Sequence, residues 1–400
     1  MILKGIRVLD FTQYLAGPTA TRLMAEMGAD IIKVERAKDG DPSRLLPIVK
    51  DKRSGYFVQQ NLGKRSLCID LKSKGSQKII LDLVNEVDVV IENFGPGVME
   101  KRGWDFKQLK KINKKIVMAS ISAFGRDSLL SHKTGFDWIA QAFAGIMDMT
   151  GPEDGSPHPV GVGIADISAG VHTFAAVGYA LFNRERTGEG QWSDISMVDC
   201  LFHSHEVNLQ VPQLTGGAFV PKRMGAHHKL LCPCGVFNSP EGHIVILCTQ
   251  GQWGNLCKAL ERPELEIDAR FDTPESRVSN QDQLIMIIEE WMAQIGEDEI
   301  ILEKLESNRV PSSPVLSPTD ALEHPYFNER GTVRVTTDRI LGTMKLPGFP
   351  LRFSDQKIYE PGNAPFLGEH NSDILREVLG YSEKTVRELY EKGILYQENF

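Results

Sequence analysis

The stretch that decides the fold runs from Gly5 to Glu35 and reads GIRVLDFTQYLAGPTATRLMAEMGADIIKVE. Its apolar segment 5–11 predicts a short β-strand, and the apolar residues of 19–27 recur at helical spacing. Gly28 stands where a glycine commonly ends a helix, and the apolar segment 30–35 predicts a second strand. This strand–helix–strand unit predicts two parallel strands joined by a helix that crosses over the sheet.

The same alternation returns further along the chain. It predicts a helix over 78–87, strands over 88–91 and 116–122, and a helix over 136–149. Strands that alternate with helices indicate an α/β fold, in which helices cover both faces of a parallel sheet. Ligands of such sheets bind at the carboxyl ends of the strands.

A segment rich in proline and glycine, 211–222, indicates a domain boundary, and a second such segment, 347–365, leads to the helices at the end of the chain. We therefore expect a large domain over 1–210, completed by 330–400, and a smaller α/β domain over 225–325. In the smaller domain the pattern predicts a strand over 243–249 and helices over 281–294 and 298–305. Asn371 and Ser382 are expected to cap two helices at the end of the chain.

The composition is that of an ordinary soluble protein, with 41% hydrophobic and 24% charged residues among 400. The uncharged segment 167–182 is shorter than the ~20 residues that cross a membrane, so we expect a buried helix and no membrane association. Lys4 and Arg7 interrupt any apolar leader, which argues against a secretory signal. Six scattered cysteines make neither a disulfide framework nor a zinc motif, so we expect a cytoplasmic protein without a metal.

Charge is distributed unevenly along the chain. The net charge is −8, yet residues 33–115 hold 19 Lys and Arg against 11 Asp and Glu. One basic block in an acidic protein argues against nucleic-acid binding, which needs a wide positive face. It favours a small polyanionic ligand, although lysines on a solvated surface give the same pattern.

The loop over 12–18 follows the first strand and occupies the phosphate-binding position of a dinucleotide fold. It lacks the GxGxxG motif, so a nicotinamide-dependent dehydrogenase is not expected. The small residues Ala16 and Gly17 would still let a ligand approach the backbone near the start of a helix.

A second loop, Asn93-Phe94-Gly95-Pro96-Gly97, follows the strand that ends near Ile91. Asn93 offers hydrogen bonds, Phe94 offers an aromatic face, and Lys101 and Arg102 offer positive charge for phosphate. A plain turn built by glycine and proline is the alternative interpretation.

Asp166 stands directly before the most apolar predicted helix, and two interpretations stay open. It is either the capping residue of that helix, worth about 1 kcal/mol, or a carboxylate nucleophile that the helix N-terminus keeps ionised. Ala169 and Gly170 would leave open space beside it.

Together these motifs resemble the class III CoA-transferases, the family of formyl-CoA transferase and carnitine CoA-transferase. The likeness covers nearly the whole chain. It is carried by several motifs in the family's order, namely 5–11 with Ala16-Gly17-Pro18, 28–35, 64–72, 92–97, Asp166 with Gly170, 187–191, and Leu367-Gly368-Glu369-His370.

The resemblance implies a Rossmann-like large domain with a parallel sheet, a smaller α/β domain, and a homodimer whose chains pass through one another like linked rings. It also implies acyl-CoA and small carboxylic acids as substrates, with coenzyme A as substrate and no permanently bound cofactor. The CoA contacts that it implies are Leu15, Ala16, Arg36, Ile69, Asp70, Leu71, Lys72, Asn93, Phe94, Gly95, Lys101, Lys133, Thr134, Gly135 and Phe136, with Arg102 able to replace Lys101.

By the same resemblance Asp166 is the nucleophile. Its carboxylate would attack the acyl-CoA thioester to give an acyl-aspartyl anhydride, and CoA thiolate would then give an aspartyl-CoA thioester. The acceptor acid would complete the exchange. Backbone N–H groups of 163–165 or Ile167 are expected to stabilise the oxyanion.

Two other functions stay open. The 2-methylacyl-CoA racemase branch of this fold resembles the chain but places a histidine between glycine and aspartate, where this chain has Phe136 between Gly135 and Asp137. Phe136 cannot move a proton. A non-catalytic CoA-binding protein would leave Asp166 as a helix cap. The glycine-rich lid of formyl-CoA transferase is represented here only by Gly216, Gly217 and Gly225, so its oxalate and formate specificity does not carry over.

Overall fold

The computed structural model describes residues 1–355 and 360–398, and the chain divides into two compact units. The first unit contains Met1–Ile146, Val160–Leu209 and Pro325–Phe400, and the second contains Met147–Pro159 and Gln210–His324. The segment Met147–Pro159 thus lies in the second unit, whereas the sequence placed it in the large domain. Whether these units fold as independent domains with the expected boundaries stays a prediction.

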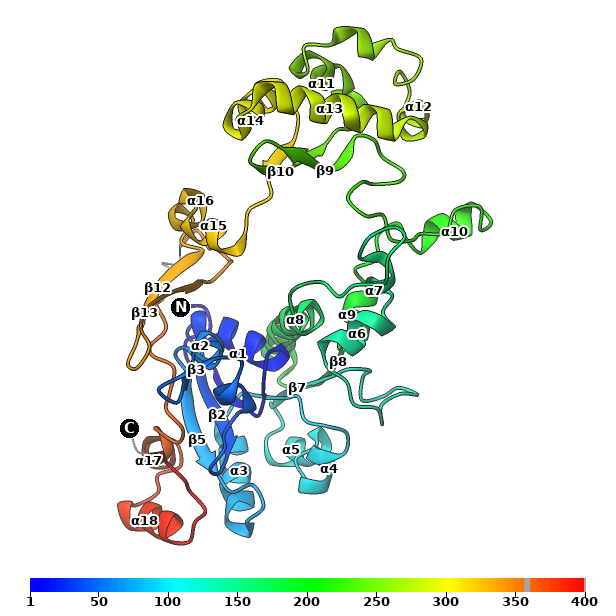
Figure 1. Ribbon diagram of the computed structural model, residues 1–400. Helices are drawn as coiled ribbons and strands as arrows, with labels where there is room; N and C mark the ends of the chain where they lie inside the picture. Colours follow the sequence, from blue (N-terminus) through cyan, green and yellow to red (C-terminus); the bar gives the residue numbers. More distant parts are fainter. Residues whose placement is uncertain (356–359, 399–400) are drawn as a thin grey trace. The chain divides into compact units, whose positions relative to one another are not determined.

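A six-stranded parallel sheet forms the centre of the first unit (Figure 1), with the strand order β5-β2-β1-β6-β7-β8. Apolar side chains alternate between its two faces, as period-two packing requires. Val8 packs on one face and Leu9 on the other. The strands are β1 (Arg7–Asp10), β2 (Asp30–Arg36), β5 (Arg65–Ile69), β6 (Val89–Glu92), β7 (Val117–Ser122) and β8 (Trp192–Ser196).

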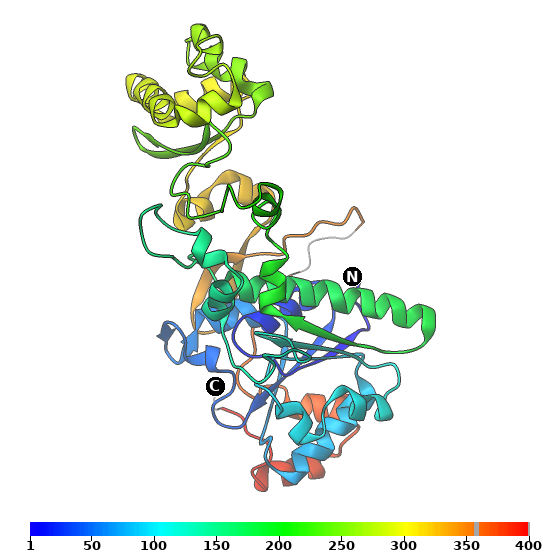
Figure 2. The ribbon, with the colours of Figure 1, turned by 90° about the vertical axis from the view of Figure 1, so that its right-hand side faces the viewer.

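Helices cover both faces of this sheet, which confirms the α/β class expected from the sequence. Figure 2 shows α8 as a long helix along one face. The core on this face involves α1 (Ala16–Glu26), α6 (Asp137–Phe143), α8 (Ile164–Thr187) and α9 (Met197–Phe202). The opposite core involves α3 (Lys74–Glu86), α4 (Val98–Arg102), α5 (Phe106–Ile112), α17 (Asn371–Glu377) and α18 (Glu383–Glu391).

The end of the chain covers the edge strand β5. Asp70 donates its backbone N–H to Ile394, and Tyr396 donates to Cys68. Asn371 lies inside α17 rather than at its cap, because its side chain is used elsewhere: Oδ1 accepts from Cys68 N at 2.7 Å, and Nδ2 donates to Tyr396 O at 2.8 Å. The expected capping role of Asn371 is therefore wrong, whereas Ser382 does cap α18.

Smaller sheets complete the described chain. The first unit also holds the pairs β3 (Val49–Lys50) with β4 (Arg53–Ser54) and β12 (Val333–Asp338) with β13 (Gly342–Pro347), and the helices α2 (Gly55–Asn61) and α16 (Pro325–Glu329). The second unit packs helices on an antiparallel sheet. Its elements are β9 (Cys234–Ser239), β10 (Gly242–Leu247), β11 (Ser312–Pro314), α10 (Gln210–Leu214), α11 (Trp253–Ala259), α12 (Pro274–Ser279), α13 (Gln281–Ile295), α14 (Asp298–Ser307) and α15 (Pro318–Glu323), while α7 (Ile146–Met149) crosses the boundary along the chain.

Among the residues that the structure describes, one helix, α8, is long and apolar enough to cross a membrane by length and composition alone. It has 24 residues and is longer than the expected segment 167–182 because it begins at Ile164 and ends at Thr187. Core helices of soluble proteins pass the same test, so this is weak evidence for a membrane span.

Helices α1 and α8 approach one another closely at Gly170. A Cβ at this position would lie 2.6 Å from the Ala16 carbonyl oxygen and 2.7 Å from Thr19 Cβ. Gly170 is therefore needed for contact between backbones. Gly178 lies on the same helix, and a Cβ there would meet no atom within 4 Å.

We expect Gly170→Ala to lower the free energy of unfolding by about 1–3 kcal/mol, because the added methyl group overpacks the α1–α8 contact. The matched control Gly178→Ala is expected to be neutral or to stabilise the protein by up to ~1 kcal/mol, since alanine favours a helix more than glycine does. Urea unfolding of both variants measures the difference. Equal midpoints for the two variants would contradict the close approach.

Candidate functional site

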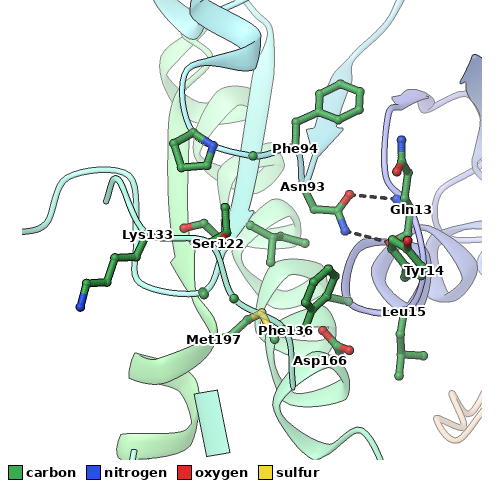
Figure 3. Close-up of a pocket in the computed structure, with 17 residues that line it drawn as sticks. Gln13, Tyr14, Leu15, Asn93, Phe94, Ser122, Lys133, Phe136, Asp166 and Met197 are labelled. Carbon is green, nitrogen blue, oxygen red and sulfur yellow. Dashed lines mark hydrogen bonds between the residues drawn. The ribbon is translucent and has the colours of Figure 1, made fainter. Parts of the chain in front are cut away.

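A pocket of about 250 Å³ lies at the carboxyl ends of β1, β6 and β7 (Figure 3). Four parts of the first unit form its walls: the loop after β1, the loop after β6, the end of β7 with the loop that leads to α6, and the first turns of α8 and α9. The lining residues are Gln13, Tyr14, Leu15, Ala16, Asn93, Phe94, Gly95, Pro96, Ile121, Ser122, Ala123, Lys133, Thr134, Gly135, Phe136, Asp166 and Met197.

The structure brings most of the predicted site residues together in this pocket. Those that line it are Leu15, Ala16, Asn93, Phe94, Gly95, Lys133, Thr134, Gly135, Phe136 and Asp166. Seven others do not line it, namely Arg36, Ile69, Asp70, Leu71, Lys72, Lys101 and Arg102. Ile69 has no exposed surface in this structure, so its side chain is not available to a ligand. Arg102 Nη1 donates a hydrogen bond to Leu71 O, which joins α4 to the loop after β5.

Asn93 joins two walls of the pocket. Its Oδ1 accepts from Gln13 N at 2.8 Å, and its Nδ2 donates to Gln13 O at 2.9 Å. Figure 3 shows both bonds between the loop after β6 and the loop after β1. Because the amide pairs with both backbone groups of Gln13, Asn93 fixes the two loops to one another.

Tyr14 is held in an unusual backbone conformation. Its φ of 63° lies in the left-handed region. A residue that carries a side chain adopts this region only at a cost in free energy. Tyr14 N donates to Asp41 Oδ1 at 3.2 Å, and the Tyr14 ring meets the Phe136 ring edge to face at 5.9 Å. The two rings lie on opposite walls of the pocket and narrow it beside Asp166.

Asp166 lies in the first turn of α8, which begins at Ile164 and has Gly163 as its N-cap. The side chain that binds the free N–H groups of this turn is Asp137, whose Oδ1 accepts from Ala165 N at 2.7 Å and from Asp166 N at 3.2 Å. None of the described residues donates a hydrogen bond to the Asp166 carboxylate. Asp166 is therefore not the helix cap, because Asp137 takes that place.

The charge state of Asp166 also differs from the sequence expectation. Burial, and then the negative charge of Asp137, raise the pKa of Asp166 to about 7. The expectation that the helix N-terminus keeps this carboxylate fully ionised is wrong, because burial and the neighbouring Asp137 charge outweigh the helix end. A half-ionised carboxylate at neutral pH suits a group that takes part in chemistry.

The backbone N–H groups at the start of α8 and at the start of α1 differ in their partners. Ala165 N and Asp166 N donate to Asp137, and Ile167 N donates to Gly163 O. The expected oxyanion donors of α8 are thus already engaged. No described residue accepts a hydrogen bond from the N–H of Ala16 or Gly17, at the start of α1.

Sequence reasoning missed three residues beside Asp166. Asp137 was noted only as a neighbour of Phe136, and Tyr14 was not singled out. Tyr56 was missed entirely, although burial, and then the nearby Asp166 charge, raise the pKa of its hydroxyl. Each is distant in sequence from Asp166, so only tertiary contacts reveal them.

Positive charge near the pocket comes from its rim. Lys133 is exposed and extends away from the other labelled side chains in Figure 3. No group of three or more His, Cys, Asp or Glu side chains that would hold a metal occurs within residues 1–355 and 360–398. The described site therefore presents a half-buried carboxylate and one exposed lysine.

Comparison with known proteins identifies the family. The model of CoA-transferase family III matches residues 3–371. The chain is 37% identical to a succinyl-CoA:mesaconate CoA-transferase of Haloarcula hispanica, over 94% of this chain and 96% of that protein. It is 33% identical to a formyl-CoA:oxalate CoA-transferase of Streptomyces coelicolor, over 98% of this chain and 99% of that protein.

Solved structures agree with the sequence relatives. A CaiB/BaiF family protein from Brucella suis superposes with a TM-score of 0.82 at 33% identity, over 94% of this chain and 99% of that one. The chain belongs to the class III CoA-transferases, and it is a CoA-transferase that uses CoA thioesters. The resemblance found in the sequence is thereby confirmed at the level of the family.

The raised pKa of Asp166 predicts a pH-dependent cost to stability. The folded protein binds the proton of the Asp166 carboxyl more tightly than the unfolded chain does, because the ordinary pKa of this group is 3.8. The stability gained from the proton is present below about pH 4 and is lost as pH rises towards 7. We expect Asp166→Asn to be more stable than the wild type at pH 8, by at most about 4 kcal/mol for three pKa units.

This difference in free energy of unfolding should shrink as pH falls from 7 towards 4, because the folded protein takes up the Asp166 proton over this range. Urea unfolding of the two proteins between pH 4 and 8 measures it. Because both chains share every other titrating group, their difference isolates Asp166. A difference that does not change with pH would contradict the raised pKa.

Proposed function

We propose that this CoA-transferase moves CoA between carboxylic acids through covalent intermediates on Asp166. The observation that carries the proposal is the Asp166 carboxylate itself. It is half-buried, receives no hydrogen bond from the described residues, and shares its pocket with nine of the expected CoA contacts. A carboxylate that is left without partners at the base of a pocket is available for nucleophilic attack.

The proposed first half-reaction conserves the energy of the thioester. An Asp166 oxygen attacks the donor thioester carbonyl, the C–S bond breaks, and CoA leaves as thiolate from an acyl-aspartyl anhydride. The thiolate then attacks the Asp166 carbonyl carbon, which releases the donor acid as carboxylate and leaves an aspartyl-CoA thioester. The acceptor carboxylate repeats the two steps in reverse and restores Asp166.

Two features of the pocket support these steps. The N–H group of Ala16, a residue that lines the pocket, is unengaged by the described residues and lies at the N-terminus of α1, where a donor for a developing oxyanion is most effective. The paired rings of Tyr14 and Phe136 narrow the pocket and would exclude water, which hydrolyses both the anhydride and the thioester.

We propose that the basic block binds the phosphates of CoA. Arg36, Lys72, Lys101, Arg102 and Lys133 supply the positive charge, while Asp70 and Leu71 supply backbone contacts. Arg36 and Lys72 follow β2 and β5, and Lys101 and Arg102 end α4, so all four follow the carboxyl ends of sheet strands. This is the edge at which such sheets bind ligands.

The relatives suggest which acids to test first. The two named relatives are a succinyl-CoA:mesaconate and a formyl-CoA:oxalate CoA-transferase, so one of them uses succinyl-CoA as donor. We propose small carboxylic acids as acceptors for this chain, with succinyl-CoA as the first donor to be tried.

We also propose a homodimer in the cytoplasm, with the interlocked arrangement that the family resemblance implies. Large apolar side chains of α6 and α8 are exposed in the single chain, among them Trp138 at 63%, Tyr179 at 75% and Phe182 at 61%. An apolar surface of this kind on a soluble protein indicates a contact with another chain. All six cysteines are free, which suits a reducing compartment.

Asp166→Ala is expected to lower transfer from succinyl-CoA by at least ~1,000-fold, because the covalent route is lost, while CoA still binds. In the wild type, hydroxylamine added during turnover should convert Asp166 into a hydroxamate, seen as a peptide mass shift. The control Asp154→Ala removes an exposed carboxylate of the second unit and should change neither result.

Full transfer by Asp166→Ala, or an adduct on another residue, would refute the nucleophile. Exchange of the α-hydrogen of a 2-methylacyl-CoA for deuterium, without acyl transfer, would instead favour the racemase. Binding of CoA with neither reaction would favour a non-catalytic protein.

The dimer has a separate test. We expect the wild type to sediment as a dimer, and Phe182→Asp to shift it towards the monomer because a charge cannot be buried unpaired. The control Ile267→Asp changes an exposed apolar residue of the second unit and should stay dimeric. A monomeric wild type at micromolar concentration would refute the proposal.

A further inference from the structure

The peptide groups around Phe94 are held from both sides by charged side chains. Phe94 N donates to Glu92 Oε2 at 2.9 Å, and Arg126 Nη2 donates to Phe94 O at 2.7 Å. Phe94 lies in the pocket wall, but neither Glu92 nor Arg126 lines the pocket. These two side chains therefore hold the backbone of the pocket wall in place without lining the pocket.

Glu92 and Arg126 also bind one another. Arg126 Nη2 lies 3.0 and 2.9 Å from the two Glu92 oxygens, so one amino group reaches both the carboxylate and the Phe94 carbonyl. The Glu92 side chain is 1% exposed and that of Arg126 is 12% exposed. A charge pair with so little solvent is strong and keeps a defined geometry, because breaking it leaves an unpaired buried charge.

The backbone of Arg126 is fixed in turn by a third strand. Asp194, in β8, accepts from Arg126 N at 2.7 Å and from Asp127 N at 3.1 Å through the same Oδ2. Glu92 ends β6, and Arg126 follows β7. The arrangement thus joins the end of β6, the loop after β7 and the middle of β8 through one arginine.

This arrangement continues into the active site. Phe94 follows Asn93, whose amide holds the Gln13 backbone next to the proposed oxyanion donor of α1. We propose that Glu92 and Arg126 are positioning residues, which set the place of the Asn93–Gly95 loop and thereby keep the pocket wall in the arrangement that binds acyl-CoA. The inference rests on the proposed function, since it concerns how that reaction's substrate is held.

The physical reason lies in how often the wall is ready to bind. When only a fraction of the molecules hold the arrangement that accepts a ligand, the observed affinity falls by that fraction. Without Arg126, Glu92 is buried without a positive partner, and the Phe94 carbonyl loses its donor. The loop then occupies several positions, of which only some accept CoA.

The test compares Arg126→Gln with the wild type in steady-state transfer and in binding of free CoA. We expect the KM for succinyl-CoA and the Kd for CoA each to rise about tenfold or more. The kcat should stay within about threefold, because Asp166 is untouched once CoA is bound. The Arg184→Gln control breaks another arginine–carboxylate pair, with Asp88 at 2.9 Å, that does not line the pocket, and it should leave KM unchanged.

A second variant separates positioning from folding. In Arg126→Ala, added methylguanidinium should enter the space left by the side chain and lower the KM at least threefold, whereas Arg184→Ala should show no such response. If Arg126→Gln does not fold, Arg126→Lys, which keeps the charge but not the forked contact, supplies the KM comparison.

A wild-type KM and Kd in Arg126→Gln, or a loss confined to kcat, would overturn the inference. So would a KM in Arg126→Ala that methylguanidinium does not lower. These outcomes differ from failure of the proposed function, which would appear as no transfer by the wild type itself. In that case the Kd for CoA alone still decides whether Arg126 positions the loop.

Discussion

The active-site wall depends on a buried positive charge beneath the first loop. The Lys33 ammonium group, which has no solvent exposure, pairs with Asp41 Oδ2 at 2.8 Å and donates to Thr12 O at 2.8 Å. Burial alone would lower the pKa of Lys33, but the nearby carboxylates of Asp41, Asp10 and Glu35 outweigh it and raise the pKa. Because Asp41 also accepts from Tyr14 N, this pair holds the loop in the left-handed conformation that turns the Tyr14 ring towards Phe136.

The loop after β1 is also held by a contact from the loop after β6, so this side of the pocket is rigid. The other side carries Asp166, whose negative charge is unfavourable there. Asn93 binds the Gln13 backbone, while Gly170 lets α8 bring its first turn against α1. Into this frame the chain places Asp166 close to Asp137, where burial opposes its charge. Two carboxylates this close repel one another and lower the stability of the folded protein. Such a pair is typical of functional sites, where reactivity is gained at the expense of stability.

The sequence predicted the helices and strands that apolar periodicity marks. It did not predict the features that depend on contacts between residues distant in the sequence. The strands β1 and β2 and the helices α13 and α14 appear near their expected bounds. The edge strands β5 and β8 were not expected because polar residues interrupt them, as in Trp192-Ser193-Asp194. Of the site, sequence identified Asp166, Asn93 and Phe136 through motifs. It did not predict the true cap of α8, because Asp137 lies 28 residues before Ala165 and is brought there only by packing of α6 on α8.

The C-terminal segment has a consequence for how the chain reaches its native state. Strand β5 is synthesised early, yet the backbone groups beside it are paired by residues around Tyr396 and Asn371. During synthesis this edge of the sheet therefore stays exposed, and can pair with other chains, until about three hundred further residues have emerged. A nascent chain that stalls while the second unit is being made carries an unprotected sheet edge, which makes it a natural client for chaperones.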